Sequence, residues 1–312
     1  MDEVRAPRDD RPMRLPARRR DDEFRTLSSS IRVDVAARTS PGRKPANADH
    51  YLVVRLGRFQ ETIASSLPEG EVPARFDESG YAICVADGTG STDTGETASR
   101  LAISTLAHLA LHFAKWDLRI DPRTADDVIR RGLRFFRGVD EHVTQAALDN
   151  PELSGMGTTL TLAFIADDTL FLGHVGHSRA YLLREGRLTR LSRDQTLAQR
   201  LDEGFPAAPM PFAAHDSGHI LTDAIGGQAG SPFIQFGKIR LQPEDCLLIC
   251  TNGLTDVVDD ETIASILGQP VSVDWRCQTL VDLALSRGPD NVTAVVAKYS
   301  IVGPVRGFVT HL

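Results

Sequence analysis

The chain has 312 residues, of which 41% are hydrophobic and 25% charged, which suits one large domain or two smaller ones. The net charge of -7 at pH 7 gives no electrostatic basis for binding nucleic acid or an anionic membrane, so we expect neither as a partner. No apolar stretch is long enough to span a bilayer and no signal-peptide pattern opens the chain, which predicts a cytoplasmic protein.

The two ends of the chain differ from the middle in composition. Residues 1–28 interleave arginines with acids and prolines and have almost no apolar content, so they cannot bury a core. We expect a disordered arginine-rich tail there; the alternative is an arginine-rich docking arm. The folded domain is expected at residues 29–301, followed by a short C-terminal tail at 302–312.

The first part of the domain reads as strands and loops. Alternation over residues 31–35 predicts a half-buried strand, and the turn-rich loop 39–45 that follows carries the cations Arg43 and Lys44. A second strand is expected at 51–55, and residues 57–79 are interpreted as a loop insertion.

Helices and strands then follow in blocks. Amphipathic spacing predicts helices at 95–118 and 125–148, and residues 155–188 are interpreted as an antiparallel meander. The segment 204–233 is rich in Gly, Pro and Ala and predicts a mobile flap. The remaining expected elements are helices at 196–203, 260–267 and 274–285 and strands at 233–241, 246–250 and 292–299. Strand runs interrupted by paired helices favour two packed sheets with helices outside.

Three polar oxygen donors stand at strand ends. The apolar run 81–86 ends in Asp87-Gly88, the run 246–250 leads into Asn252, and Asp290 precedes the last strand. Each alone is typical of an ordinary turn. Together they supply the oxygen ligands that a hard cation such as Mg²⁺ prefers.

The ordered motifs of the chain resemble the metal-dependent protein phosphatases, also called the protein phosphatase 2C-like or PPM family. The motifs are Ala86-Asp87-Gly88-x-Gly90, Gly155-Met156-Gly157-Thr158-Thr159, Val175-Gly176-x-Ser178-Arg179-Ala180-Tyr181, the strand before Gly253-Leu254, and Asp290-Asn291-Val292-Thr293. The resemblance runs from about residue 31 to 299. It implies an α+β fold, a four-layer α/β/β/α sandwich of two antiparallel sheets.

The resemblance also implies a chemistry. A two-ion Mg or Mn site between the sheet edges would hydrolyse phosphoserine and phosphothreonine through a metal-activated water. Asp87, the Gly88 carbonyl and Asp290 match family metal ligands, with Asp87 bridging both ions. A basic residue that holds the substrate phosphate falls at Arg43 or Lys44, and the spacing favours Lys44.

Three positions depart from the family pattern. Ala48 stands where the family usually has Glu, Asn252 where it has Asp, and His177 where it has Asp. An amide oxygen can still ligate an ion, whereas imidazole suits Mn or Zn better than Mg. Asp49 adjoins Ala48 and could help, although adjacent side chains of a strand face opposite ways.

Two readings of the function therefore stay open. The first is a working serine/threonine phosphatase with weakened metal binding, whose partners are a phosphorylated protein and, by analogy, an opposing Ser/Thr kinase. The second is a pseudophosphatase that keeps the fold and binds a phosphoprotein without turnover. A third, an α/β scaffold whose acids only form turns, is disfavoured by the ordered motifs.

Overall fold

A computed structural model describes residues 31–68, 71–72, 74–90, 92–115, 118–204, 219–226 and 230–301. The predicted tails, 1–28 and 302–312, lie outside the described residues. Within the described part of the chain, no helix is long and apolar enough to cross a membrane.

The strands form two antiparallel sheets. One sheet has the order β1 (Ile31–Ser40), β11 (Val292–Ile301), β10 (Cys246–Cys250), β7 (Arg179–Arg184), β8 (Arg187–Arg190). The other has the order β2 (Asp49–Glu61), β3 (Arg75–Thr89), β5 (Leu160–Ala166), β6 (Thr169–Val175), β9 (Gln235–Arg240), and the short β4 (Gly157–Thr158) pairs with β3. The first and last strands of the domain, β1 and β11, pair along their whole length, which closes the chain on itself.

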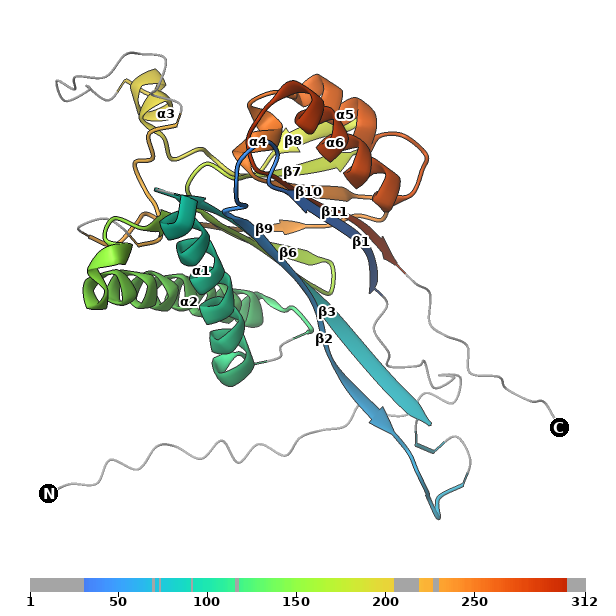
Figure 1. Ribbon diagram of the computed structural model, residues 1–312. Helices are drawn as coiled ribbons and strands as arrows, with labels where there is room; N and C mark the ends of the chain where they lie inside the picture. The colour runs from blue at the N-terminus through green and yellow to red at the C-terminus, as the bar shows by residue number, and fades with distance from the viewer. Residues whose placement is uncertain are drawn as a thin grey trace, which may run out of the picture.

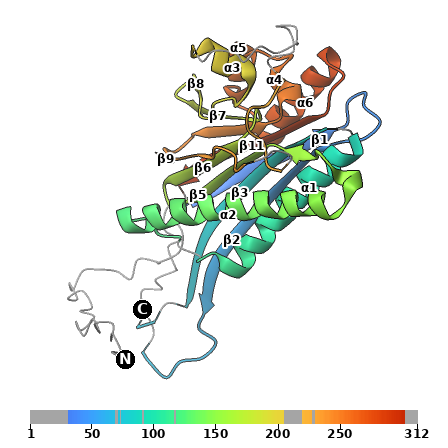
Figure 2. The ribbon, with the colours of Figure 1, turned by 90° about the vertical axis from the view of Figure 1, so that its left-hand side faces the viewer.

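Helices cover the outer face of each sheet (Figures 1 and 2). The helices are α1 (Thr92–Phe113), α2 (Pro122–Asp149), the 3-10 turn η1 (Pro151–Leu153), α3 (Leu197–Asp202), α4 (Asn252–Thr255), α5 (Asp260–Leu267) and α6 (Val273–Arg287). Helices α1 and α2 lie on the β2-containing sheet and α4 to α6 on the β1-containing sheet. The α+β fold and its four-layer α/β/β/α sandwich are therefore confirmed.

The core is divided in the same way as the layers. Alternate residues of the strands point inward, and a central cluster fills the space between the sheets, with Ile83 and Ile249 fully buried in it. The opposite faces of the strands pack on the helices: Phe136 and Leu160 belong to the cluster under α1 and α2, and Leu248 and Leu280 belong to the cluster under α5 and α6. The loops at the sheet ends are thus held by three rigid layers of packing.

The expected loop at 57–79 is wrong over most of its length. Strands β2 and β3 stay paired from Asp49↔Asp87 out to Glu61↔Arg75, whereas β5 covers β3 only from Gly80 to Val85. The outer part is a two-stranded ribbon that extends away from the body (Figure 1). The residues of β2 from Gly57 to Glu61 are exposed, Phe59 at 75%, and the buried residues opposite them, Glu78 and Ser79, are polar, so the sequence lacks the apolar alternation that signals a strand.

The expected single meander at 155–188 is also corrected. Strands β5 and β6 belong to one sheet and β7 and β8 to the other. The chain crosses between the sheets at Gly176, whose φ is 104°, and a Cβ there would lie 2.6 Å from the Thr159 side chain. This crossing places His177 and Ser178 where the two sheets meet.

The segment 204–233 is not peripheral throughout, which corrects the flap prediction in part. Residues 205–218 and 227–229 lie outside the described residues. Ile225 is fully buried in the cluster beneath α1 and α2, and it forms a bridge with Thr158. Asp140 of α2 accepts a hydrogen bond from the Gly226 amide at 2.8 Å, so this part of the segment is fixed to the helix layer.

Candidate metal centre

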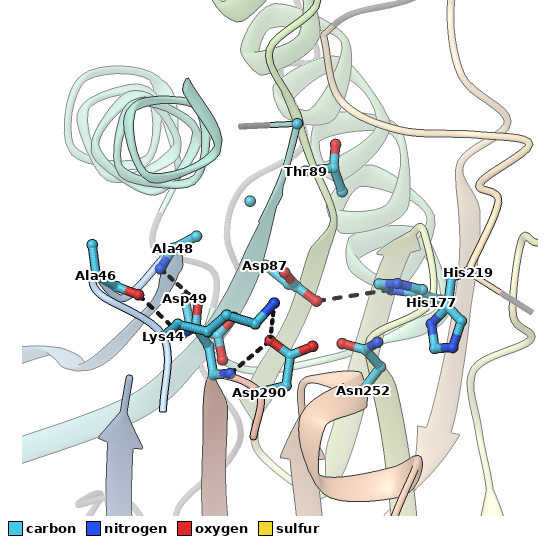
Figure 3. A pocket seen from close by; sticks show the side chains of 13 residues that line it. Lys44, Ala46, Ala48, Asp49, Asp87, Thr89, His177, His219, Asn252 and Asp290 are labelled. Atoms are coloured by element: carbon cyan, nitrogen blue, oxygen red, sulfur yellow. Dashed lines mark hydrogen bonds and ion pairs between the residues drawn. The ribbon is translucent and has the colours of Figure 1, made fainter. Parts of the chain in front are cut away.

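A polar pocket of about 360 Å³ opens at the sheet ends where the sheets meet (Figure 3). The strand ends, the loop before β2 and the start of α4 contribute its walls. Its lining residues are Lys44, Ala46, Ala48, Asp49, Asp87, Gly88, Thr89, Gly90, His177, His219, Asn252, Asp290 and Asn291. Lys44 and Asn291, which are 247 positions apart in the sequence, thus line the same pocket.

A buried carboxyl group, that of Asp49, and a partly buried one, that of Asp87, form the floor of this pocket. Asp49 and Asp87 are register partners in the β2–β3 ladder, and Asp49 is only 3% exposed. The Thr251 hydroxyl donates a hydrogen bond to Asp49 Oδ2 at 2.7 Å. Burial raises the pKa of Asp49 to about 6, and burial together with the charges of Asp49 and Asp290 raises the pKa of Asp87 well above its ordinary value. A bound cation would offset this concentration of negative charge.

Backbone geometry brings Asp87 into the pocket. Its carbonyl accepts hydrogen bonds from the Thr159 amide and the Thr158 hydroxyl, both at 2.9 Å. At the next residue, Gly88, a Cβ would lie 2.0 Å from the carbonyl oxygen of Gly95 at the start of α1. Only glycine permits this approach of strand end and helix, so the Asp-Gly pair is required by packing as well as by chemistry.

Asp290 and Lys44 face each other across the mouth of the pocket. Lys44 Nζ lies 3.2 Å from Asp290 Oδ1, and both side chains are about half exposed, at 48% each. The side chain of Lys44 reaches over the carboxylates in Figure 3. The neighbouring Arg43 does not line the pocket, and its backbone amide donates to the Pro289 carbonyl at 2.8 Å. Of the two predicted phosphate-binding cations, the structure brings Lys44 to the carboxylates.

Asn291 holds the loop that carries Lys44. Its amide nitrogen donates to the carbonyls of Pro41 and Ala46, and its Oδ1 accepts from the Ala48 amide at 2.9 Å. Ala48 itself is buried, and its methyl group offers no ligand. The buried acid at this corner is Asp49, whose side chain does face Asp87, contrary to the concern that strand alternation would turn it away. Ala48 precedes β2, so the alternation rule does not apply across that boundary.

Asn252 is oriented by a residue one turn further along the chain. Its Nδ2 donates to Asp256 Oδ2 at 2.9 Å, and its amide oxygen lies on the side of Asp290 in Figure 3. His219 Nδ1 lies 3.8 Å from the same Asp256 carboxylate. Burial raises the pKa of Asp256. The sequence analysis gave Asp256 no role in the site. The signal that could have identified it is its i+4 spacing from Asn252, at which polar side chains of a helix interact.

His177 lies beside Asp87 on the inner wall. It is 8% exposed, its Nδ1 lies 4.0 Å from Asp87 Oδ2, and this nitrogen has no hydrogen-bond partner among the described residues. Burial lowers the pKa of the imidazole to about 4, so the ring is neutral at pH 7. Arg179, two residues on, forms a bidentate pair with Asp194 and supports the wall from behind.

The donors in the pocket fit divalent ions, although among the described residues no three His, Cys, Asp or Glu side chains form a preassembled cluster. Carboxylate, amide and carbonyl oxygens are ligands suited to Mg²⁺ and Mn²⁺. The pKa values of two neighbouring carboxyl groups, Asp49 and Asp87, are raised by desolvation and by each other's charge or that of Asp290, which is the situation that a cation relieves. Asp87, Asp290, the Gly88 carbonyl and Asn252, with Asp49 behind them, are the residues that would hold such ions.

Comparison with known proteins agrees with this geometry. The family model described as Protein phosphatase 2C matches residues 72–277. The chain belongs to the protein phosphatase 2C family. This family model ends before Asp290, so the place of that acid rests on the Asp290-Asn291-Val292-Thr293 motif and on its position in the pocket.

Individual relatives of this phosphatase 2C chain are bacterial. It is 35% identical over 239 residues to serine/threonine protein phosphatase PstP of Mycobacterium tuberculosis, a match that covers 75% of this chain and 44% of PstP. The chain therefore spans less than half of the length of that relative. It is 31% identical over 213 residues to a putative protein phosphatase 2C-type of Streptococcus pyogenes, covering 68% of this chain and 82% of the other. The crystal structure of the PstP catalytic domain in complex with two manganese ions superposes with a TM-score of 0.64 and 31% identity, covering 86% of this chain and 99% of that domain.

Proposed function

We propose that this member of the phosphatase 2C family is a metal-dependent phosphoserine/phosphothreonine protein phosphatase that uses Mn or Mg. The observation that carries the proposal is the meeting of Asp49, Asp87 and Asp290 with Lys44 in one pocket at the sheet ends. The relatives with the same fold are named serine/threonine phosphatases, and one was solved with two manganese ions.

The chemistry follows from the residue types. Bound at Asp87, Gly88, Asn252 and Asp290, divalent ions would offset the charge of a phosphate monoester and lower the pKa of a water. Lys44 would bind phosphoryl oxygens as a point charge at the mouth of the pocket. Thr251 keeps the Asp49 carboxyl turned toward Asp87 and so maintains the negative floor.

In this proposal, the residues at three positions lower the affinity of the site for the second ion. Ala48 and Asn252 bring no charge, and His177 is neutral where a carboxylate is expected from the family pattern. Asp256 adds a partly buried negative charge next to Asn252, which compensates in part. We propose one tightly held ion and a weaker second one, with modest turnover. The alternative of a binding protein without turnover gains no support from the named phosphatase relatives.

The biological setting follows from the same site. The substrate class is a protein phosphorylated on Ser or Thr, and a Ser/Thr kinase acting on it would be the opposing enzyme. Among the described residues all four cysteines are free and buried, which agrees with the reducing cytoplasm that the sequence predicts.

The test is hydrolysis of matched phosphoserine, phosphothreonine and phosphotyrosine peptides by metal-stripped protein resupplied with Mn or Mg. We expect metal-dependent release of phosphate from the first two peptides. Asp87→Asn should reduce the rate by more than about a hundredfold, beyond the 10- to 100-fold typical of outer-shell partners. A folded natural protein that binds these peptides but releases no phosphate with either ion would establish the binding-only alternative instead.

A further inference from the structure

His177 is held rigidly in the wall of the pocket. It follows Gly176 at the crossing between the sheets, and Gln195 forms two hydrogen bonds with Gly176. The backbone amide of Gly176 donates to the side-chain oxygen Oε1 of Gln195 at 2.7 Å. The Gly176 carbonyl accepts from the backbone amide of Gln195 at 2.8 Å. The imidazole is 8% exposed, so it has little freedom to turn toward solvent.

The orientation of His177 leaves a buried nitrogen without a partner. Its Nδ1 forms no hydrogen bond with any described residue. An unsatisfied buried polar atom loses its hydrogen bonds to water without gaining others, and such atoms in native proteins need an explanation. The other buried histidine nearby, His174, has no such atom, because its Nδ1 contacts the Thr161 hydroxyl and its Nε2 contacts the carbonyls of Gly176 and Arg193. His174 is therefore a structural histidine, and His177 is not.

The space next to this nitrogen has the dimensions of a metal bridge. His177 Nδ1 lies 4.0 Å from Asp87 Oδ2, too far for a hydrogen bond, and both groups face the pocket (Figure 3). Metal–nitrogen and metal–oxygen bonds of about 2.1 Å place two ligands of one ion about 3 Å apart when adjacent and about 4 Å apart when opposite. The observed separation falls within that range.

We propose that His177 Nδ1 and Asp87 Oδ2 ligate the same divalent ion, and that the imidazole makes this site select Mn, Fe, Co or Zn over Mg. Imidazole is a good ligand for these transition ions, whereas Mg²⁺ prefers oxygen. Asn252 lines the same pocket, and its amide oxygen brings no charge, so the choice of metal depends more strongly on the imidazole nitrogen. This inference deepens the proposed function, because it concerns the same pocket.

Pulsed electron paramagnetic resonance of Mn²⁺ in the metal-stripped full chain tests the contact directly, with no need for activity. We expect nitrogen coupling to Mn²⁺ that changes when the protein is labelled with ¹⁵N-histidine. His177→Asp should remove the coupling while keeping a ligand, and His177→Ala should also remove it. The matched control is His219→Ala, because His219 lines the same pocket and should leave the coupling intact.

Selectivity gives a second readout from the same variants. In competition titrations, His177→Asp should lower the preference for Mn²⁺ over Mg²⁺ by about tenfold or more, the lower end of what metal-site changes produce. Coupling that survives His177→Asp, or that disappears in His219→Ala, would overturn the inference. Bound Mn²⁺ without nitrogen coupling in the natural protein would overturn it too, and would leave the proposed hydrolysis untouched. Nitrogen coupling in a protein that hydrolyses no phosphopeptide would reject the proposed function and keep His177 as a ligand.

Discussion

Asp49 and Asp87 face each other across the β2–β3 ladder in the floor of the pocket, where the Asp49 carboxyl group is buried and that of Asp87 is 15% exposed. The hydroxyl of Thr251, which follows β10 of the other sheet, donates a hydrogen bond to Asp49 Oδ2 at 2.7 Å. Two like charges at such close quarters are unfavourable unless a proton or a cation lies between them. In the absence of ions, repulsion between these carboxylates therefore destabilises the fold at the place where ions are expected to bind.

The first prediction concerns stability without metal. The pKa of Asp49 in the folded protein is about 6, above the ordinary 3.8 that applies to the unfolded chain. The protonated form is therefore favoured by folding: this contribution is complete below pH 3.8 and is lost as the pH rises through 6. At pH 7.5 the charge destabilises the fold, so Asp49→Asn should raise the free energy of unfolding, by of order 1–3 kcal/mol at about 1.4 kcal/mol per pKa unit.

Thermal melts in a chelator between pH 4 and 8 measure this effect. The gain in Tm from Asp49→Asn should be largest above pH 7 and should disappear toward pH 4. Glu61→Gln, at the exposed end of β2, is the control and should shift stability by no more than about 0.5 kcal/mol at any pH. A variant that is less stable than the natural protein at pH 7.5 would show that Asp49 contributes hydrogen bonds worth more than its charge costs.

The second prediction separates the two neighbouring cations of the first loop. Lys44 contacts Asp290 at 3.2 Å and lines the pocket, whereas Arg43 does not line it. Hydrogen bonds to charged groups are worth about 1.5–3 kcal/mol, so Lys44→Ala should lower kcat/KM for a phosphopeptide about 10- to 100-fold. Arg43→Ala should change it less than threefold or so, about the effect of an ordinary surface substitution. Equal losses in both variants, measured by phosphate release, would remove the special role of Lys44.

The sequence was most informative where packing and chemistry act on the same residue. The buried run before Asp87 and the strand before Asn252 are short, apolar and bounded by glycine, so both could be placed from pattern alone. The outer ribbon of β2 and β3 could not, because Gly57 to Glu61 are exposed, the buried Glu78 and Ser79 are polar, and no apolar alternation marks it. The burial of Asp49 was hidden for a different reason: it depends on Thr251, which lies 202 positions away.

Residues that act through a neighbour were also missed. Asp256 matters through its hydrogen bond to Asn252, and Asn291 through three bonds to the loop before β2. The i,i+4 spacing of Asn252 and Asp256 marks that pair in the sequence, whereas nothing in the sequence links Asn291 to its partners in the loop about 245 positions earlier. The break of the expected meander at Gly176 depends on long-range pairing of β7 with β10, which local periodicity does not encode.

The third prediction concerns Asn252 and the acid that orients it. Asp256→Ala removes the acceptor of the Asn252 amide, which frees the side chain to turn its nitrogen toward the pocket. Mn²⁺ affinity, measured by calorimetric titration, should fall about 10- to 100-fold, as for other partners of metal ligands. Asn252→Asp, which adds a carboxylate at the same place, should strengthen binding. The variant Asp259→Ala removes the N-cap of α5 outside the pocket and controls for general loss of stability. Unchanged affinity in Asp256→Ala would mean that Asn252 is not a ligand.

The fourth prediction tests the close approach of β3 to α1. A Cβ at Gly88 would lie 2.0 Å from the Gly95 carbonyl oxygen, a backbone atom that cannot move without shifting the helix start. Gly88→Ala should therefore destabilise the protein by about 1–3 kcal/mol, as overpacking of a tight site does, and should displace Asp87 with it. Denaturant unfolding and Mn²⁺ titration of the same samples measure both effects.

Gly237→Ala is the matched control for that change, because Gly237 is also in a strand, β9, and a Cβ there would meet nothing within 4 Å. It should leave Mn²⁺ affinity unchanged, and its stability should stay within about 1 kcal/mol of the natural protein, since alanine also suits a strand better than glycine. If Gly88→Ala keeps full metal affinity, the strand end tolerates the shift, and the position of Asp87 does not depend on the contact with α1.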